Sequence, residues 1–466
     1  MEVLATVKAE ERKNTMTTRL VGFIDRWLAV PLSLTLRWLA CGVTAVRGRR
    51  SIPARGQTIC LAKFARLGSI INTIPTLQAV RERYPSAHIV YVTFARHREL
   101  VRRLSYIDEG LFIDEHSALT LVYSFYVATR RLRQLSPSFY LDLQCYTLTY
   151  FSALVATLSG ASRTIGFFRQ SSLAKKRLLD NAIYFNAFQP LQTGFEQVAA
   201  VIGCELRASS KTDNYCLTTL ARDREELERY LDPEDTMATP LLVINPNASA
   251  ACLERRWPRE RFAETAYALL RRIPDLRIML IGTAEERGYV EGLRFAIDSN
   301  HERVLNLAGM LSVGGLLALL KRASCLLTND SGPMHLAFAL GIPTVALFGP
   351  VNPQDHVSQA NQQKTVIFYQ PVSCSPCIHF ISPPPCGGEN VCMQRIPVAS
   401  VRDACLALLT ATPLRGGLAA QWKPAPRTTP MPDRDRIATR FPPGSYAAIG
   451  RSGRLSDKET TTYFLQ

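Results

Sequence analysis

Residues 326–353, LLTNDSGPMHLAFALGIPTVALFGPVNP, decide the fold. An apolar run enters a polar turn, a helix is expected from about Met334 to Leu340, and a second apolar run, 343–348, ends at Gly349. A unit of strand, turn, helix and strand is the repeat from which parallel α/β proteins are built. This stretch therefore predicts a parallel sheet covered by helices.

The polar turn carries Asp330, Ser331, Gly332 and Pro333 just where the helix begins. The first N–H groups of a helix lack intrahelical partners and its dipole is positive there, so this position favours an anionic group such as phosphate. The same pattern also fits an ordinary helix with Asp330 or Ser331 as its N-cap. Taken alone, the turn predicts either a phosphate site or a plain cap.

The Asp-Ser-Gly-x-x-His run at 330–335 resembles the signature of glycosyltransferase family 9, the lipopolysaccharide heptosyltransferases and their relatives. In that family the run wraps the diphosphate and sugar of an activated donor. The resemblance implies that Asp330, Ser331, Gly332, Pro333 and His335 bind the donor. It also implies the GT-B architecture, in which two Rossmann-like α/β domains face a cleft.

Length and composition limit the class of protein. The chain has 466 residues, too many for one ordinary domain, which predicts two domains with extensions. A hydrophobic fraction of 47% is that of a globular protein, and a formal charge of +16 suits an anionic partner such as a phosphorylated glycolipid or a membrane surface. No RNA- or DNA-binding signature accompanies the charge, so we expect no nucleic-acid partner.

Apolar runs alternate with helical patterns in two series. The expected strands are 58–63, 88–93, 111–113, 139–143 and 164–166, then 241–245, 277–281, 304–306, 325–328 and 344–348. Such alternation predicts two parallel sheets. With the resemblance, we expect residues 1–55 to form a polar N-terminus and a membrane-interface helix, 56–235 the N-terminal acceptor domain, 236–411 the nucleotide-sugar domain and 412–466 a disordered tail.

Residues 19–46 are almost wholly apolar. Their arginines fall on one narrow stripe of a helical wheel, and Trp27 and Trp38 fit a membrane interface. We favour an amphipathic helix that lies in the interface. One alternative is a single span, in which Arg37 near the middle would cost roughly 2.5–3.5 kcal/mol. The other is an ordinary core-packing helix.

Two turns of the second series are further candidates for donor binding. Asn247 and Ser249 stand in the polar turn INPNAS that follows the strand at 241–245. The family places a Lys or Arg just before its Arg/His-Trp-Pro run, where it contacts the donor phosphates, and the matching residue is Arg255.

A carboxylate follows the strand at 277–281, in the segment IGTAEERG. A carboxylate in such a place accepts hydrogen bonds from ribose hydroxyls in dinucleotide-binding folds, and the resemblance points to Glu285 or Glu286. A carboxylate at the start of a helix is also favourable without any ligand.

The acceptor side departs from the family pattern. Ser69, in KFARLGSIIN at 63–72, stands where the family has the Asp that is expected to act as general base. A serine hydroxyl is far too weak a base near neutral pH. Three explanations stay open: another carboxylate such as Asp142 acts, or leaving-group stabilisation leaves the base role to water or His335, or the chain binds without turnover. Asp142 can equally be a strand-end residue that caps the next helix.

Four of the twelve cysteines, Cys374, Cys377, Cys386 and Cys392, invite comparison with a zinc site. The segment is loop-rich and, apart from the Cys-x-x-Cys pair at 374–377, the two other spacings are irregular, so we favour reduced structural cysteines and no metal. Most other cysteines stand singly in apolar surroundings, as in a reduced cytosolic protein. The first residues lack the apolar segment of a signal peptide.

The resemblance implies transfer of a sugar, with inversion and without a catalytic metal or cofactor, from an ADP-heptose type donor to a lipid-linked saccharide of the lipopolysaccharide core. We expect the protein in the cytoplasm, peripherally attached to the inner membrane. The alternatives are a nucleotide-sugar epimerase of the GT-B class and a non-catalytic nucleotide-sugar binding protein.

Overall fold

A computed structural model describes most of the central part of the chain. The residues it describes are Asp25, Trp27, Ala29, Pro31, Thr35 and 57–64, 66–187, 189–205, 217–231, 238–248, 252–297, 302–357, 364–378 and 384–410. The expected disordered tail at 412–466 and the expected domain boundary between 235 and 236 lie outside these residues.

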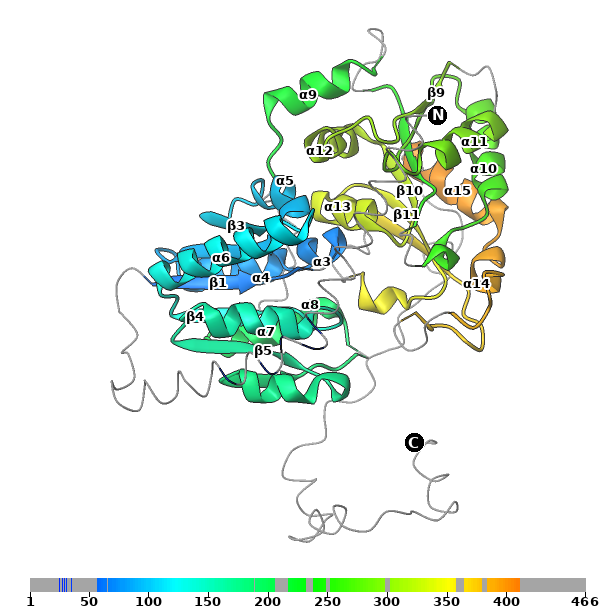
Figure 1. Ribbon diagram of the computed structural model, residues 1–466. Coiled ribbons are helices and arrows are strands. Elements are labelled where there is room, and N and C mark those ends of the chain that lie inside the picture. The colour runs from blue at the N-terminus through cyan, green and yellow to red at the C-terminus, as the bar shows by residue number, and fades with distance from the viewer. Residues whose placement is uncertain are drawn as a thin grey trace, which may run out of the picture. The chain divides into compact units, whose positions relative to one another are not determined.

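Two six-stranded sheets, in which neighbouring strands run parallel, form the framework (Figure 1). The first has the order β3-β2-β1-β4-β5-β6, with β1 (Thr58–Ala62), β2 (His88–Phe94), β3 (Glu109–Ile113), β4 (Phe139–Asp142), β5 (Arg163–Phe168) and β6 (Asn181–Tyr184). The second has the order β12-β11-β10-β7-β8-β9, with β7 (Leu241–Asn245), β8 (Arg277–Leu280), β9 (Val304–Asn306), β10 (Cys325–Asn329), β11 (Thr344–Phe348) and β12 (Thr365–Tyr369). The α/β fold class expected from the sequence is confirmed.

Helices connect the strands. Those of the first series are α3 (Leu67–Ile71), α4 (Ile74–Arg83), α5 (Arg98–Val101), α6 (Ala118–Leu135), α7 (Thr149–Leu158) and α8 (Leu191–Ala200), with the 3-10 helices η2 (Ala95–His97) and η3 (Gln170–Leu178). Later come α9 (Ala221–Glu228), η4 (Leu253–Arg255), α10 (Arg259–Arg272), α11 (Arg287–Ile297), α12 (Val313–Arg322), α13 (Gly332–Leu340), η5 (Pro353–Asp355), α14 (Val391–Gln394) and α15 (Val398–Leu409).

The sequence patterns predicted every strand except the edge strands β6 and β12. Each of them pairs with one neighbour only, so the register of β6 depends on β5 and that of β12 on β11. A short apolar run is compatible with a strand or with a buried helix segment, and only its neighbours decide.

Each sheet reverses its strand order once, between β1 and β4 in the first and between β7 and β10 in the second. In open α/β sheets, ligands bind outside the carboxyl ends of the strands at such a reversal. A ligand-binding site is therefore expected at the turns that follow β1, β4, β7 and β10.

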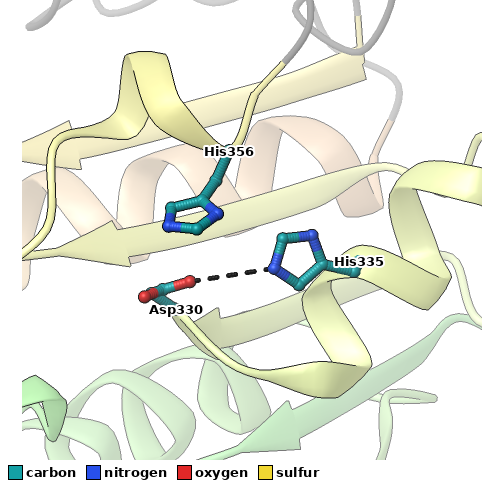
Figure 2. Close-up of side chains that lie close together, drawn as sticks. All are labelled: Asp330, His335 and His356. Atoms are coloured by element: carbon teal, nitrogen blue, oxygen red, sulfur yellow. Dashed lines mark ion pairs between the residues drawn. The ribbon is translucent and has the colours of Figure 1, made fainter. Parts of the chain in front are cut away.

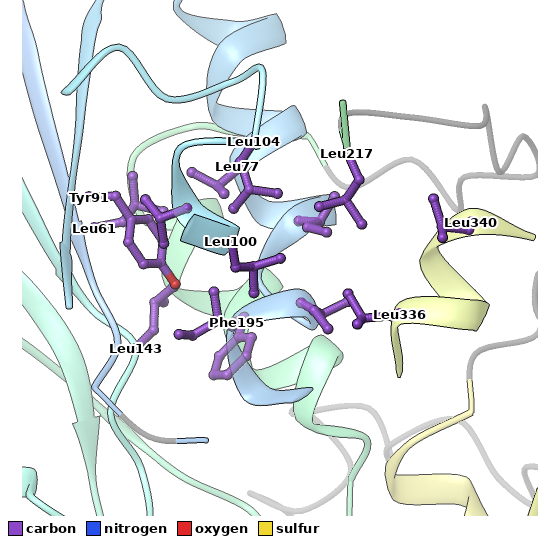
Figure 3. Close-up of a cluster of buried hydrophobic side chains, with 14 of the residues drawn as sticks. Leu61, Leu77, Tyr91, Leu100, Leu104, Leu143, Phe195, Leu217, Leu336 and Leu340 are labelled. Carbon is purple, nitrogen blue, oxygen red and sulfur yellow. The ribbon is translucent and has the colours of Figure 1, made fainter. Parts of the chain in front are cut away.

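We call the described residues 57–231, which contain the first sheet, the first half, and 238–410, which contain the second sheet, the second half. One cluster of buried apolar residues runs from the first half into the second (Figure 3). Leu77 of α4 and Phe195 of α8 belong to it, together with Leu336 and Leu340 of α13. Because Leu336 and Leu340 are one helical turn apart, α13 turns an apolar face towards the first half while its N-terminus stays at the edge of the second sheet.

Charged groups add to this contact at the start of α12. Glu99 accepts hydrogen bonds from the backbone N–H groups of Val313 and Gly314, at 3.2 and 3.0 Å. Glu226 accepts from the N–H and the hydroxyl of Ser312, both at 2.6 Å. Carboxylates suit the positive N-terminus of a helix, so these bonds fix α12 against residues of the first half.

The expected membrane-interface helix at 19–46 falls mostly outside the described residues. Of the positions that are described, Asp25 accepts from the N–H groups of Tyr150 and Phe151 at 2.8 and 2.7 Å, and so caps the start of α7. Ala29 is buried, whereas Trp27 is 64% exposed. Within the described residues, no helix combines the length and the apolar character needed to cross a bilayer.

Candidate functional site

The turns after β7 and β10 are joined by asparagine side chains at the reversal of the second sheet. Asn245, which ends β7, donates to the hydroxyls of Thr328 and Ser331 at 3.1 and 2.6 Å. Asn329, which ends β10, donates to the carbonyl of Pro246 at 3.0 Å and accepts from the N–H of Trp257 at 3.1 Å. Three chain segments are therefore held together at one edge of the sheet.

Arg255 and Asp330 meet at this edge although 75 residues separate them. Arg255 donates to the Asp330 carboxylate at 3.2 Å and to its backbone carbonyl at 3.3 Å. Arg255 is 8% exposed and Asp330 3% exposed. The Asp330 carboxylate fixes the Arg255 guanidinium at the N-terminus of α13. A second anion bound there would interact with both the guanidinium and the positive end of the helix dipole.

The N-terminus of α13 has no side-chain cap. Ser331 occupies the N-cap position, but its hydroxyl contacts Asn245 and Thr328 rather than the first helical N–H groups. Pro333 at the start lacks an N–H and fits the first turn without a lost hydrogen bond. The positive end of α13 is thus available for an oxyanion.

Three side chains gather beside this helix start (Figure 2). His335 Nε2 lies 4.0 Å from Asp330 Oδ1, and the rings of His335 and His356 meet edge to face with centroids 5.4 Å apart. Burial is the main cause that lowers the pKa of His335, and Arg255 lowers it further, against the opposing charge of Asp330. His335 is therefore neutral near pH 7 and able to hydrogen-bond a sugar or phosphate.

The same three side chains offer potential metal ligands within 4.8 Å of one another. Arg255 already holds Asp330, and its positive charge opposes a cation at that carboxylate. The arrangement therefore fits an anion better than a divalent metal.

Two buried polar atoms near the site lack a partner among the described residues. They are Nε of Arg255 and Oδ1 of Asn247, whose amide nitrogen donates to the carbonyl of Ile281 at 3.0 Å. Buried polar atoms are nearly always paired in folded proteins, so unpaired ones call for a ligand or water. Ser249, the third predicted residue of this region, lies outside the described residues.

Glu286 rather than Glu285 is positioned beside Asn247. Glu286 accepts from the N–H of Thr283 at 2.9 Å and lies 3.5 Å from Arg256, whereas Glu285 is exposed. A Cβ on Gly282 would come within 2.5 Å of Asn247 and 3.3 Å of Glu286. The two side chains converge at the end of β8, where a ribose could be recognised.

The first half approaches this edge through α3, the helix that follows β1. A Cβ added to Gly68 would lie 2.3 Å from the ring of His335, so only glycine permits the contact. Ser69 is the next residue and is half-buried. The turn after β1 and the start of α13 are therefore adjacent.

Asp142 is placed differently from Ser69. It is 0% exposed and forms a 2.8 Å ion pair with Lys175, which is also 0% exposed. Its other oxygen accepts from the N–H of Gln144 at 3.0 Å and from the hydroxyl of Ser152 at 2.6 Å. These partners give the carboxylate a structural role at the end of β4.

Comparison with known proteins agrees with this geometry. Residues 129–384 match glycosyltransferase family 9 (heptosyltransferase). The chain belongs to glycosyltransferase family 9. The resemblance read from the run at 330–335 is thereby confirmed.

Individual relatives of family 9 are distant. The lipopolysaccharide core heptosyltransferase OpsX of Haemophilus influenzae is 23% identical over 316 residues, which cover 67% of this chain and 85% of that protein. The lipooligosaccharide heptosyltransferase 2 of the same species is 34% identical over 101 residues, but these span only 29% of its length.

Solved structures from family 9 confirm the GT-B fold of paired parallel sheets. The Escherichia coli ADP-heptose lipopolysaccharide heptosyltransferase II gives a TM-score of 0.59 at 18% identity and covers 76% of this chain and 99% of that one. The family 9 glycosyltransferase from Veillonella parvula gives 0.57 at 20% identity, with 67% and 86% covered.

Sequence reasoning missed Asp355 and His356, which follow the apolar strand at 344–348. They stand a few residues after the Gly349-Pro350 turn, beyond the carboxyl end of β11, which lies beside β10. A position beyond the carboxyl end of a strand was the sequence signal that could have marked them as candidate site residues. Burial, reinforced by the charge of Asp330, raises the pKa of Asp355 to about 7.

The four cysteines considered for a metal lie close enough for their charges to interact. Burial raises the pKa of both Cys377 and Cys392 to about 11, which favours thiols over thiolates. Cys374 is exposed and Cys386 half-buried. Among the described residues they form no group at metal-ligand spacing, so whether they bind a metal stays a prediction.

Proposed function

We propose that this chain transfers a heptose from an ADP-heptose type donor to a hydroxyl of the lipopolysaccharide core or a related glycolipid. One observation carries the proposal above the others. The ion pair between Arg255 and Asp330 sits at the start of α13, which has no side-chain cap, at the strand reversal of the second sheet. The heptosyltransferase names of the relatives and of the aligned structures support the choice of donor and acceptor.

The site supports a reaction that needs no metal. As the bond between sugar and phosphate breaks, negative charge grows on the departing diphosphate, and catalysis requires that charge to be stabilised. Arg255 and the N–H groups of α13 supply fixed positive potential there. Attack by the acceptor from the opposite face of the sugar would invert the anomeric carbon.

Donor recognition is assigned to the residues around this helix start. We propose that Ser331, Gly332 and His335 contact the diphosphate and sugar, and that Asn247 and Glu286 contact the nucleoside. The orphan Oδ1 of Asn247 supports the last assignment, because a nucleoside hydroxyl or amine would satisfy it.

An anionic membrane surface is the proposed site of the acceptor. The exposed apolar side chains of α6 are Leu119, Val122, Tyr123, Tyr126 and Val127, which recur at helical spacing and share one face. Three exposed arginines, Arg130, Arg131 and Arg133, follow at the end of the helix. An apolar face beside arginines suits anionic headgroups, which supports a peripheral location at the cytoplasmic face of the inner membrane.

The test is a transfer assay with purified protein, ADP-heptose and heptose-free lipopolysaccharide. Release of ADP that depends on the acceptor, together with a heptosylated product, supports the proposal. An isomerised donor would instead favour the epimerase alternative. Tight donor binding without any release of ADP would favour a binding protein, the alternative that Ser69 suggests.

A further inference from the structure

A transferase of this kind needs a group that takes the proton from the acceptor hydroxyl, and Ser69 is unsuited to do so. The other carboxylates assigned to the site are engaged. Asp142 is paired with Lys175, and Asp330 with Arg255. Glu286 accepts from the N–H of Thr283. A base with free carboxylate oxygens must come from another element.

Asp355 ends η5, in the turn that follows β11. The turn is fixed because Asn352 accepts from the N–H of Gln354 through its side chain and from the N–H of Asp355 through its backbone, both at 3.0 Å. Asp355 is half-buried, and no hydrogen bond or ion pair to its carboxylate is found among the residues that the structure describes. A fixed backbone with an unengaged carboxylate is the arrangement that a general base requires.

The neighbours of Asp355 place it where the two halves face each other. It lies within electrostatic reach of Asp330 in the second half and of Tyr146, which follows β4 in the first. The next residue, His356, packs against His335, whose ring occupies the space above Gly68. The residue next to Asp355 is thus connected through His335 to Gly68, the neighbour of Ser69 in the first half.

We propose that Asp355 is the general base of this enzyme, in the role that the family gives to an Asp at position 69; the inference rests on the proposed transferase function. Its carboxylate takes the proton of the acceptor hydroxyl while the hydroxyl oxygen bonds to the anomeric carbon of the donor. The bond from that carbon to the diphosphate oxygen breaks, and its electron pair leaves with the diphosphate, towards Arg255 and α13. The proton ends on Asp355, so atoms and charges balance.

The ionisation of Asp355 fits this role. Burial, together with the negative charge of Asp330, brings its pKa to about 7, where a base is both deprotonated and strong enough to act near neutral pH. The other titratable groups around it are His335 and His356, with Tyr146 and Tyr369. Both tyrosines have pKa values raised mainly by burial, so they stay neutral in this range.

The experiment compares wild-type protein with Asp355→Asn in the ADP-heptose and heptose-free lipopolysaccharide assay. We expect kcat to fall by about 10²–10⁴-fold while ADP affinity, measured by calorimetry, changes less than about threefold. In wild-type protein log kcat/KM should rise with pH up to about 7, and the variant should lose that limb. Ser69→Asp added to Asp355→Asn should recover part of kcat, because it restores a carboxylate on the facing turn.

Two results would overturn the proposal: a kcat within about threefold of wild type in Asp355→Asn, or a loss confined to the KM for the donor, which would make Asp355 a sugar-binding residue. An unfolded variant is recognised by circular dichroism, and Asp355→Ser then serves as the second test with the same readouts. Failure of the wild-type protein to transfer any sugar would instead refute the proposed function itself.

Discussion

The two halves share one strand order but place their charges differently at the strand reversal. In the second half, Arg255 and Asp330 pair at the sheet edge beside a helix start without a side-chain cap and beside buried atoms that lack partners. In the first half, the carboxylate at the end of β4 is Asp142, which is paired with Lys175 and inaccessible to solvent.

The difference is the one expected if a single topology serves the proposed donor binding at one strand reversal and internal structure at the other. An ion pair with spare donors can receive a ligand, whereas one whose members are both fully buried mainly preserves its own geometry. Lys63, a second buried cation of the first half, also has a partner within the protein, because it donates to the carbonyl of Leu143 at 2.8 Å. The acceptor chemistry is therefore expected from Asp355, in a turn of the other half.

The largest effect is expected on stability, from Lys175→Met. The change leaves the Asp142 carboxylate buried without its cation, which typically costs about 3–5 kcal/mol. Urea unfolding would measure the loss. Adding Asp142→Asn should recover part of it, because the remaining group is neutral. If Lys175→Met unfolds at the wild-type urea concentration, the ion pair is not the structural element that the comparison assumes.

Arg255→Lys probes the opposite half and should act on activity more than on stability. Lysine keeps the charge beside Asp330 but loses the planar fork that can hold a carboxylate and a phosphate together. We expect kcat/KM to fall by about 10²–10³-fold, the range seen when one donor to a developing oxyanion is removed. Arg259→Lys, on a half-buried arginine at the start of the adjacent helix α10, is the matched control. Equal kinetics for both variants would show that Arg255 does not reach the donor.

The sequence was informative where function lies in one local segment. The stretch 326–353 predicted the strands and the turn, and its run 330–335 indicated the family, because all of these are encoded within a few adjacent residues. Arg255 could be named as a candidate for the same reason, from its position before Trp257-Pro258, and its donor contact stays a prediction. The sequence did not predict pairs of residues that are distant along the chain and brought into contact by the tertiary fold.

Lys175 shows why. It lies in η3, 33 positions beyond Asp142, and nothing in the surrounding residues distinguishes it from a surface lysine. The contact between Gly68 and His335 is similar, since it depends on how α3 and α13 approach each other. Asp355 was missed because a carboxylate in a polar turn is ordinary until burial and the nearby Asp330 change its ionisation.

A smaller, pH-dependent effect should separate the histidines of the two halves. Burial, with a contribution from Arg96, lowers the pKa of His97 to about 3, whereas the unfolded value is near 6.5. The unfolded chain therefore binds the extra proton below pH 6.5, and stability should fall towards acid by about 1.4 kcal/mol per pH unit from this group.

His97→Gln should reduce that slope between pH 6.5 and about 4 without lowering the rate of transfer at neutral pH. Urea unfolding at a series of pH values gives the slope. His335→Gln, in contrast, should lower kcat/KM at neutral pH, since His335 stands beside Asp330 at the proposed donor site. An acid slope identical in His97→Gln and wild type would contradict the structural role given to His97.

The smallest effect is expected at the surface of the first half, on α6. Leu119 is 84% exposed and Tyr123 72% exposed, one helical turn apart on the face proposed to meet the membrane. The double variant Leu119→Ser, Tyr123→Ser should weaken binding to phosphatidylglycerol vesicles by roughly thirtyfold, since each of the two apolar side chains that enter the interface contributes about 1 kcal/mol. Gln134→Ser, an exposed residue near the end of the same helix, should change binding little. Unchanged sedimentation of the double variant with these vesicles would mean that α6 faces solvent, and that the first half reaches its lipid acceptor through another surface.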